Sequence, residues 1–522
     1  MPDVVRTVLT AVMVTSLMLV GCDSDDGSTN QRDPRERAAP PPESVAGVDL
    51  YALPRPVAMS CRRIGTRARA PVLCPTRLPR PSRGLAGSAF VPYPLSVGPL
   101  AGRGGAVVGL NFAYSAETGN PNLDGPERFL HFDVQVREPD ERLPAKTFVT
   151  TLGGRRGLIA PATSRNYAVE PYFANHVRFF WREDGASYAA TLHNFGPRTR
   201  AVLGAIIGGL RPARDVTAPA TSAPADRSVR VPIAGPSAVA IGSAGPWIAG
   251  TGAVGTRQGE QTTLVQLDPD SGKVVSGPKQ ISRYTGPTAL ATSHGLWISQ
   301  FGFHQPDILR LRMGDGAFAE YFTAGMNIGD LAVTDRTIWA LDNGRFHGYS
   351  QTAGGTIERI ERRTGRTVVR IRVGRGPSEL ALGAGRVWAA NNLDDSLSRI
   401  DPRTNRVTAT TPVGVAPVGV AAGEGAIWVA NSADDTVSRI DAESARVVQT
   451  IDVGLGPRGV AVGEGSVWVS NYLEDTVSRI DPRVGRVIET IPVGAGPTGI
   501  AVGHGAVWVA DLLDQAVSRI EP

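Results

Sequence analysis

Side chains suited to molecular recognition are concentrated in three segments of the C-terminal half of the chain, 250–262, 299–307 and 342–355. Each segment combines glycine-rich backbone with arginine, histidine or aromatic residues, types that often dominate binding surfaces. The candidate ligand-binding residues are Arg257, Phe301, Phe303, His304, Arg345, Phe346, His347 and Tyr349. No histidine–carboxylate constellation can be placed on one surface, so no catalytic residue, metal ligand or cofactor is predicted. Loops that have drifted without acquiring a function are the alternative interpretation.

Acidic residues recur in a second group of segments. They are Asp394-Asp395, Asp434-Asp435, Glu474-Asp475 and Asp514. An acidic surface would attract a cation or a basic partner. Their regular recurrence favours a structural role in turns, with pairing to Arg399, Arg439, Arg479 and Arg519 as a further contribution. Calcium requires six or more oxygen ligands, and no single segment supplies that many.

Both groups of residues belong to an internal repeat. Its register is marked by tryptophans at 247, 297, 339, 388, 428, 468 and 508. Each regular unit has four short β-branched runs, such as GVAVG, SVWVSN, TVSRID and RVIETI, separated by Gly, Pro, Asn or Asp turn residues. Four strands in each of seven units predict a seven-bladed β-propeller, and a β-solenoid is the alternative. The tryptophans are then expected to pack one blade against the next.

Ring closure provides an independent argument for the propeller. The last unit ends at Pro522 after its third strand, while SVRVPIAG at 228–235 resembles a fourth strand without a unit of its own. We therefore expect residues 228–234 to complete the final blade, which leaves no open sheet edge between first and last units. The three recognition segments are insertions between the second and third strands of blades one to three, so they are predicted to share one face of the ring.

The repeats resemble the YVTN family of seven-bladed propellers, on phrases such as VGLGPRGVAV, VWVSN and TVSRID. They are also similar to the virginiamycin B lyase-like propeller group through the G-P-x-G-I-A-V phrase. The resemblance covers residues 228–522 and implies a propeller fold. The shared phrases are strand and turn signatures, so the resemblance assigns no catalytic residue.

The N-terminal segment is typical of a bacterial lipoprotein. Arg6 precedes an apolar run that ends in Leu19-Val20-Gly21-Cys22, which resembles a lipobox. Residues 1–22 are therefore predicted to be a signal peptide with Cys22 as the acylated (palmitate-bearing) residue, and 23–47 a disordered tether. An ordinary cleaved signal with a chance cysteine is the alternative.

Residues 48–211 do not repeat and are predicted to form a small α+β domain, followed by a linker at 212–227. The segments 128–137, 176–184 and 187–195 alternate like strands, and 197–210 has helical spacing. Export favours a Cys61–Cys74 disulfide over two free thiols. Eight arginines and no acid lie between Arg55 and Arg83, as expected for a solvated face or for attraction to an anionic membrane.

Composition limits the function classes. The net charge of +5 over 522 residues does not indicate whole-chain nucleic-acid binding, and three cysteines exclude a disulfide framework or a zinc-cluster protein. The sequence predicts a monomeric, lipid-anchored, extracytoplasmic membrane protein whose propeller face binds a protein, peptide or cell-envelope ligand without a cofactor. A propeller lyase or hydrolase that uses a metal on that face is one alternative, and a largely structural scaffold of the cell envelope is another, so whether the chain is an enzyme stays open.

Overall fold

The computed structural model describes residues 43–53, 55–68, 70–79, 95–101, 107–114, 131–137, 143, 146–160, 176–193, 197–216, 228–233, 235–251, 262–281, 286–291, 295–301, 308–311, 318–322, 328–342 and 355–522. The predicted signal peptide, Cys22 and most of the predicted tether and linker lie outside these residues. Within them, no helix combines the length and apolarity needed to cross a bilayer.

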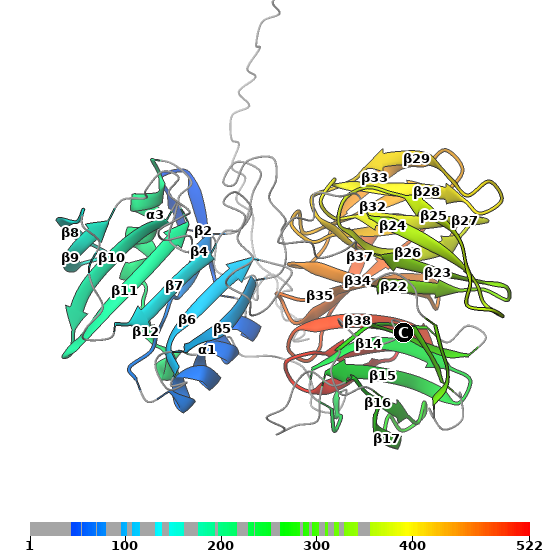
Figure 1. Cartoon of the computed structure of the whole chain (residues 1–522), viewed down its shortest axis with the longest axis horizontal. Coiled ribbons are helices and arrows are strands. Elements are labelled where there is room, and N and C mark those ends of the chain that lie inside the picture. Colours follow the sequence, from blue (N-terminus) through cyan, green and yellow to red (C-terminus); the bar gives the residue numbers. More distant parts are fainter. Residues whose placement is uncertain are drawn as a thin grey trace, which may run out of the picture. The chain divides into compact units, whose positions relative to one another are not determined.

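The described part of 228–522 forms seven four-stranded antiparallel sheets (Figure 1). Blade one contains β14 (Pro236–Gly242), β15 (Gly245–Thr251), β16 (Thr262–Leu267) and β17 (Val274–Gln280). Blade two contains β18 (Gly286–Ala291), β19 (Leu296–Phe301), β20 (Ile308–Leu311) and β21 (Phe318–Phe322). Blade three contains β22 (Ile328–Val333), β23 (Thr337–Asp342), β24 (Thr356–Glu361) and β25 (Thr367–Arg372). Blade four contains β26 (Pro377–Gly383), β27 (Arg386–Asn391), β28 (Ser396–Asp401) and β29 (Arg406–Pro412). Blade five contains β30 (Pro417–Gly423), β31 (Ala426–Asn431), β32 (Thr436–Asp441) and β33 (Arg446–Asp452). Blade six contains β34 (Pro457–Gly463), β35 (Ser466–Asn471), β36 (Thr476–Asp481) and β37 (Arg486–Pro492). Blade seven contains β38 (Pro497–Gly503), β39 (Ala506–Asp511), β40 (Ala516–Ile520) and, as its outer strand, β13 (Ser228–Arg230).

The sheets close into a ring, as the sequence predicts. The first strand of each blade contacts the first strand of the next, and β38 contacts β14 (Figure 1). β13 pairs antiparallel with β40, Ser228 opposite Ser518 and Arg230 opposite Ala516, and the Val231 N–H donates to the Gln515 carbonyl. Val231 and Ile233 are buried behind this strand. The segment 228–233 therefore completes the last blade, and the chain is mainly β with a propeller.

The tryptophans pack one blade against the next, which confirms their predicted role. Each of the seven is at most 2% exposed. Trp508 of blade seven, for example, lies in one apolar cluster with Ile248 and Val265 of blade one. In blades four to seven the indole Nε1–H donates to a glycine carbonyl five residues earlier, at 3.1–3.2 Å. Burial and this polar contact together explain why the tryptophan recurs.

The N-terminal domain is built on a seven-stranded antiparallel sheet in the order β5-β6-β7-β11-β10-β9-β8. The strands are β5 (Leu95–Ala101), β6 (Val107–Tyr114), β7 (His131–Val136), β8 (Phe148–Leu152), β9 (Arg155–Ala160), β10 (His176–Glu183) and β11 (Ala186–His193). Smaller sheets are formed by β1 (Glu43–Val45), β2 (Val48–Ala52) and β4 (Arg77–Pro79), and by β3 (Leu73–Cys74) and β12 (Arg211–Pro212). The helices are α1 (Arg55–Arg67), α3 (Thr199–Gly208) and the 3₁₀ turn η4 (Ala213–Asp215).

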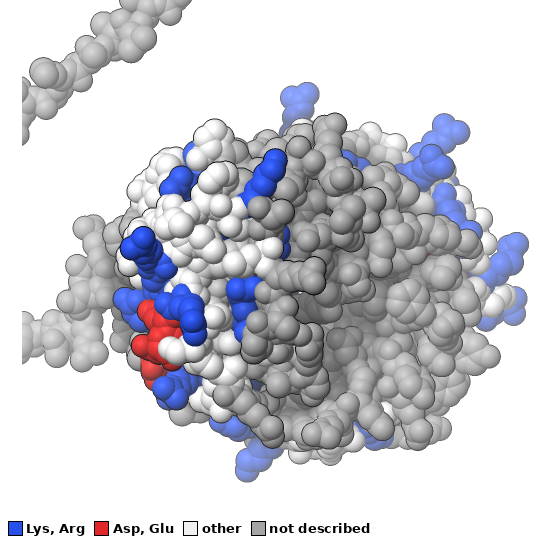
Figure 2. Space-filling view, turned by 60° about the vertical axis from the view of Figure 1, so that its left-hand side comes forward, with Lys and Arg blue, Asp and Glu red and all other residues white. Residues whose placement is uncertain are grey.

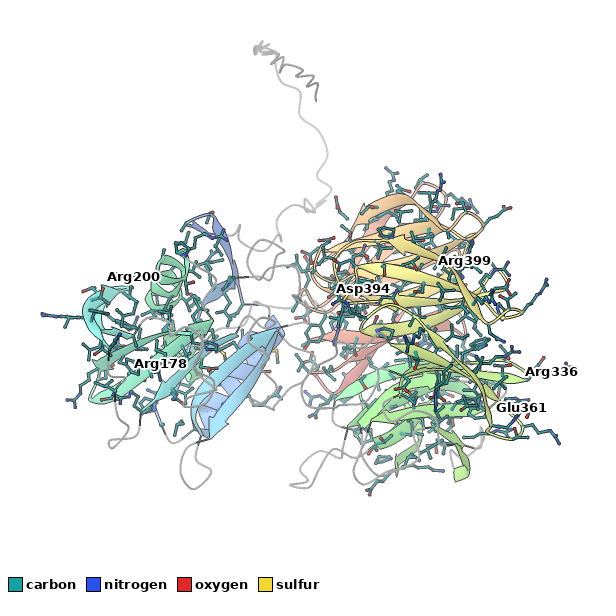
Figure 3. All side chains as sticks on the ribbon, turned by 45° about the horizontal axis from the view of Figure 1, so that its top comes forward. Arg178, Arg200, Arg336, Glu361, Asp394 and Arg399 are labelled. Carbon is teal, nitrogen blue, oxygen red and sulfur yellow. A yellow bond between two sulfur atoms is a disulfide. The ribbon has the colours of Figure 1, made fainter. Side chains whose placement is uncertain are left out.

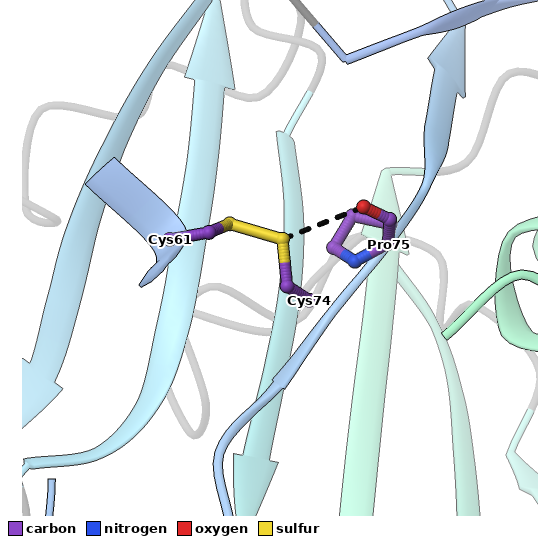
Figure 4. The surroundings of a disulfide bond; sticks show 3 residues. All are labelled: Cys61, Cys74 and Pro75. Atoms are coloured by element: carbon purple, nitrogen blue, oxygen red, sulfur yellow. Dashed lines mark hydrogen bonds between the residues drawn. A yellow bond between two sulfur atoms is a disulfide. The ribbon is translucent and has the colours of Figure 1, made fainter. Parts of the chain in front are cut away.

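Several expectations for this domain hold. The predicted strand segments 176–184 and 187–195 form the β10–β11 hairpin, which turns at Asp184 and Gly185, both at positive φ. Helix α3 lies within the predicted helical segment 197–210, and its apolar residues Val202, Ile206 and Ile207 are buried. The disulfide joins Cys61 of α1 to Cys74 of β3, and both residues are fully buried (Figure 4).

The domain extends a little beyond its predicted limits. At its N-terminal end, Val45 of β1 packs against the core, although 23–47 was predicted to be a tether. At its C-terminal end, Ala213 and Val216 are buried in the same core, so the first described residues of the predicted 212–227 linker belong to the domain. The arginine-rich segment from Arg55 begins with helix α1, on which Arg62 and Arg63 are exposed.

Candidate recognition face of the propeller

The loops between the second and third strands of a blade lie beside the loops that enter its first strand. In blade five, Asp434 Oδ2 accepts a hydrogen bond from the Val415 N–H at 2.6 Å, which joins loop 432–435 to loop 413–416. The same contact occurs between Asp514 and the Ala495 N–H in blade seven. The two sets of loops therefore share one face of the ring, the recognition face, as the repeat pattern predicts.

The second acid of each pair reaches the neighbouring blade. Asp435 Oδ1 accepts from the Gly456 N–H at 2.8 Å, and Asp475 Oδ1 accepts from the Gly496 N–H at 2.9 Å. Asp395 makes the same contact with the Ala416 N–H. The paired carboxylates thus join loops and blades by accepting hydrogen bonds from backbone N–H groups, which confirms their structural role.

The predicted pairing of these acids with the third-strand arginines is wrong. The guanidinium of Arg399 lies over the Trp388 ring, 6.0 Å from its centroid, and Arg439, Arg479 and Arg519 lie likewise over Trp428, Trp468 and Trp508. Figure 3 labels Asp394 and Arg399 at separate positions on the same blade. The side chain that does pair with Asp394 is Arg375, at 2.6 Å. An arginine recurs opposite each of these tryptophans because a cation over an indole face is favourable.

The asparagines that end the second strand of blades four to six make buried hydrogen bonds beneath the recognition face. Asn471 Nδ2 donates to the hydroxyls of Thr476 and Ser478, and Asn391 and Asn431 donate to the corresponding pairs in their blades. Blade seven has Asp511 at this position and Ala516 in place of the first hydroxyl. Asp511 is fully buried and accepts from the Ser518 hydroxyl at 2.7 Å. Burial raises the pKa of Asp511 well above its usual value, and the charges of Asp514 and Asp475 raise it further.

Two carboxylates replace small residues on the innermost strands of blades three and four. The third position of this strand is Gly in blades five to seven, whereas it is Asp330 in blade three and Glu379 in blade four. Asp330 Oδ2 accepts from the Leu380 N–H at 2.6 Å, across the boundary between the two blades. Burial raises the pKa of Asp330 to about 7. Burial, followed by the charge of Asp330, raises the pKa of Glu379 well above its usual range. Aligning the repeats by their tryptophans reveals this difference from the sequence alone.

An ion pair between a buried glutamate and an exposed arginine distinguishes blade three. Glu358 of β24 is fully buried, and its Oε1 lies 2.7 Å from Arg370 Nε on β25. Its other oxygen accepts from the Thr367 hydroxyl. The regular blades carry Ser at this position, for example Ser398 and Ser438. A buried glutamate requires such partners, so Arg370 and Thr367 account for its presence.

The predicted ligand-binding residues fall almost entirely outside the described residues. Phe301 ends β19, where its backbone pairs with Gly286. The others are Arg257, Phe303, His304, Arg345, Phe346, His347 and Tyr349, and their candidate role stays a prediction. The strands that flank their loops are in place: β15 and β16, β19 and β20, and β23 and β24 pair as neighbours. The strand ends that flank these loops accordingly lie on the recognition face of three consecutive blades.

On the opposite face, a histidine joins two blades. His504 lies in the β38–β39 turn with its Nε2 2.8 Å from the Gly242 carbonyl of blade one. Glu424 and Glu464 occupy the equivalent turns of blades five and six. His504 therefore helps to join the last blade to the first.

In the described part of the chain, no group of three or more His, Cys, Asp or Glu side chains is arranged to hold a metal ion.

No protein-family model matches the sequence, and no curated protein matches it. Among solved structures, one titled "Streptogramin B lyase structure" is 20% identical, with a TM-score of 0.44, and the match covers 56% of this chain and 96% of that one. The Kuenenia stuttgartiensis hydrazine synthase is 12% identical with a TM-score of 0.41, over 56% and 97%. At this level of similarity the comparisons assign no activity to the chain.

Proposed function

We propose that the chain is a lipid-anchored extracytoplasmic binding protein whose recognition face, in blades one to three, engages a protein, peptide or envelope ligand. The observation that carries the proposal is the contrast around the ring. In blades four to seven the loop carboxylates are occupied by backbone N–H groups of their own or the next blade. Blades one to three have longer loops at the same place, with arginine, histidine and aromatic residues instead of the acid pair.

The binding role is tested by crosslinking the full chain in membranes. In one variant, residues 343–355 are replaced by the regular loop of blade four, residues 392–395. A matched control exchanges the regular loop 432–435 of blade five for 472–475 of blade six. A crosslinked species that disappears only in the first variant supports the proposal, whereas unchanged crosslinks in both variants refute it. Metal-dependent turnover lost on His304→Ala or His347→Ala would instead identify an enzyme.

The anchor is tested separately. Metabolic labelling with a palmitate analogue is expected to label the wild-type chain and not Cys22→Ala, and the variant should leave the membrane fraction. Label that persists in Cys22→Ala, or membrane retention without label, would contradict lipid anchoring at this residue.

A further inference from the structure

An apolar strand edge is exposed on the N-terminal domain. β8 is the last strand of the seven-stranded sheet, so one side of its backbone has no partner strand among the described residues. Phe148 is 61% exposed and Val149 67%, and Leu143 nearby in sequence is 41% exposed. Successive residues of a strand point to opposite faces, so apolar groups project on both sides of this edge. Scattered apolar residues are ordinary on a surface, but adjacent ones on an open edge favour a docking function.

Three exposed cations lie on or beside this edge. Lys146 and Arg156 are exposed, and the segment 146–160 contains no Asp or Glu. Arg200, at the start of α3, is also exposed and donates from Nη2 to the Thr150 hydroxyl at 2.6 Å (labelled in Figure 3). The neighbouring carboxylate, Glu183 of β10, is already paired with Arg155 at 2.8 Å. Figure 2 shows Lys and Arg side chains spread over the described part of this view, with acidic side chains gathered at one place. The β8–β9 edge therefore combines apolar protrusion with net positive charge.

The edge is held rigidly. At the tip of the β8–β9 hairpin, Gly153 is at φ +54° and lies against the backbone of Gly204 and Gly208 in α3, where a side chain would clash. Arg155 donates from Nη1 to the Ile207 carbonyl at the end of α3. A surface fixed by these contacts loses little conformational entropy on binding.

We propose that the β8–β9 edge docks on an anionic lipid surface, with Phe148 and Val149 at the boundary of the acyl chains and Lys146, Arg156 and Arg200 among the headgroups. Charge selects this occupant. Edge-to-edge pairing of two copies would bring the same cations together, and like charges across an interface oppose association. Apolar residues ringed by lysine and arginine are the pattern of a surface that lies in the membrane interface. The inference rests on the proposed membrane location, but it concerns the folded domain and not the acyl anchor.

The test uses the full chain with Cys22→Ser, which removes the acylation site. Binding is measured to vesicles of phosphatidylcholine alone and to an equimolar mixture with phosphatidylglycerol, by flotation and by amide hydrogen exchange. The N-terminal apolar run is present in every variant, so its contribution cancels in the comparison. The variants are Phe148→Ser with Val149→Ser, and Lys146→Gln with Arg156→Gln. The matched controls change equally exposed residues of the propeller, Val448→Ser and Arg446→Gln.

We expect slowed exchange at residues 146–152 on the anionic vesicles only. The vesicle-bound fraction of the Phe148→Ser, Val149→Ser variant should fall about tenfold, because it loses apolar contacts equivalent to part of a buried side chain. Each cation removed should cost about fivefold. The controls should stay within about twofold, as surface changes away from an interface do.

Three results would overturn the inference. These are unchanged exchange at 146–152 on anionic vesicles, equal binding to neutral vesicles, and equal losses in the propeller controls. A lipid-independent dimer abolished by the Phe148/Val149 variant would also overturn it, since the edge would then pair with a second copy. None of these outcomes touches the palmitate-label test of Cys22, so failure of the docking surface and failure of the anchor are distinguishable.

Discussion

Asp511 provides the sharpest test of the electrostatics of the propeller. It occupies the position of Asn391, Asn431 and Asn471, but it is a fully buried carboxyl with a pKa well above its usual value, because burial disfavours its charged form. We predict that Asp511→Asn stabilises the chain at neutral pH. The amide is isosteric with the carboxyl group and carries no charge, and the Asp511 site differs from the asparagine sites of blades four to six mainly by Ala516.

The sign and size follow from proton linkage. A group whose pKa is raised on folding contributes stability that is fully present below its unfolded pKa, about 3.9 for Asp, and that is lost as the pH rises toward the folded value. Between the two pKa values the free energy of unfolding falls by about 1.4 kcal/mol per pH unit for this one group. Asp511→Asn lacks this slope. The stability difference from wild type should therefore grow by about 1.4 kcal/mol per unit from about pH 4 upward.

The assay is guanidinium unfolding of both chains across this pH range, followed by tryptophan fluorescence, with Trp508 in the same blade. The reverse variant, Asn471→Asp in blade six, should acquire the slope that Asp511→Asn loses, and it also forfeits the donors to Thr476 and Ser478. Parallel pH profiles for wild type and Asp511→Asn would show that Asp511 is not protonated in the fold, and the reasoning would fail.

Three further predictions concern other parts of the chain. Asp330, with a folded pKa of about 7, should add a similar loss of stability from about pH 4 to pH 7; Asp330→Asn should abolish it in the same unfolding series, and a retained slope would contradict the raised pKa. Val231→Pro removes the N–H donated to Gln515 and should cost about 1–3 kcal/mol; limited proteolysis should then cut near 228–233 faster than in Val275→Pro, and equal rates would argue against ring closure by this segment. Replacing both cysteines, Cys61→Ala with Cys74→Ala, opens a 14-residue loop and should destabilise the N-terminal domain by about 3 kcal/mol. Calorimetry should show this loss in the unfolding transition of the N-terminal domain, with the propeller transition unchanged. A shift of both transitions would contradict independent unfolding of the two domains.

The propeller was predictable because its signals are redundant. The tryptophan register, the β-branched runs and the turn residues all repeat, and the unpaired 228–234 pattern complements the missing last strand. The N-terminal domain offers no such redundancy. Strands β8 and β9, with Gly157 inside one and an apolar–polar pattern that does not alternate, have weak local signals, and their pairing is set by contacts across the sheet. Helix α1 was missed because its arginines dominate the segment, although Val57, Ala58 and Cys61 form its buried side.

Side-chain roles were predictable only where geometry follows from repetition. That the acid pairs are structural could be inferred from their recurrence, yet their partners could not, because the donors are backbone N–H groups in the loops that enter the same blade or the next one. The arginines were assigned to the wrong partner for a similar reason. Arg399 lies opposite Trp388 across the β27–β28 pair, a register that appears only once the strands are aligned in space.

The departures from the repeat point to an asymmetric ring. In blades five to seven, Gly419, Gly459 and Gly499 let the innermost strands approach their neighbours so closely that a side chain would clash with the adjoining backbone. The corresponding positions carry Asp330, at the boundary of blades three and four, and Glu379, which faces blade five, and burial raises the pKa of both carboxyl groups. Deprotonation of Asp330 near neutral pH is therefore expected to weaken the boundary of blades three and four. Blade three also bears the long loop 343–355, so one pH-dependent boundary of the ring adjoins a blade that carries proposed recognition residues, and Asp511 adds a second pH-dependent position in blade seven.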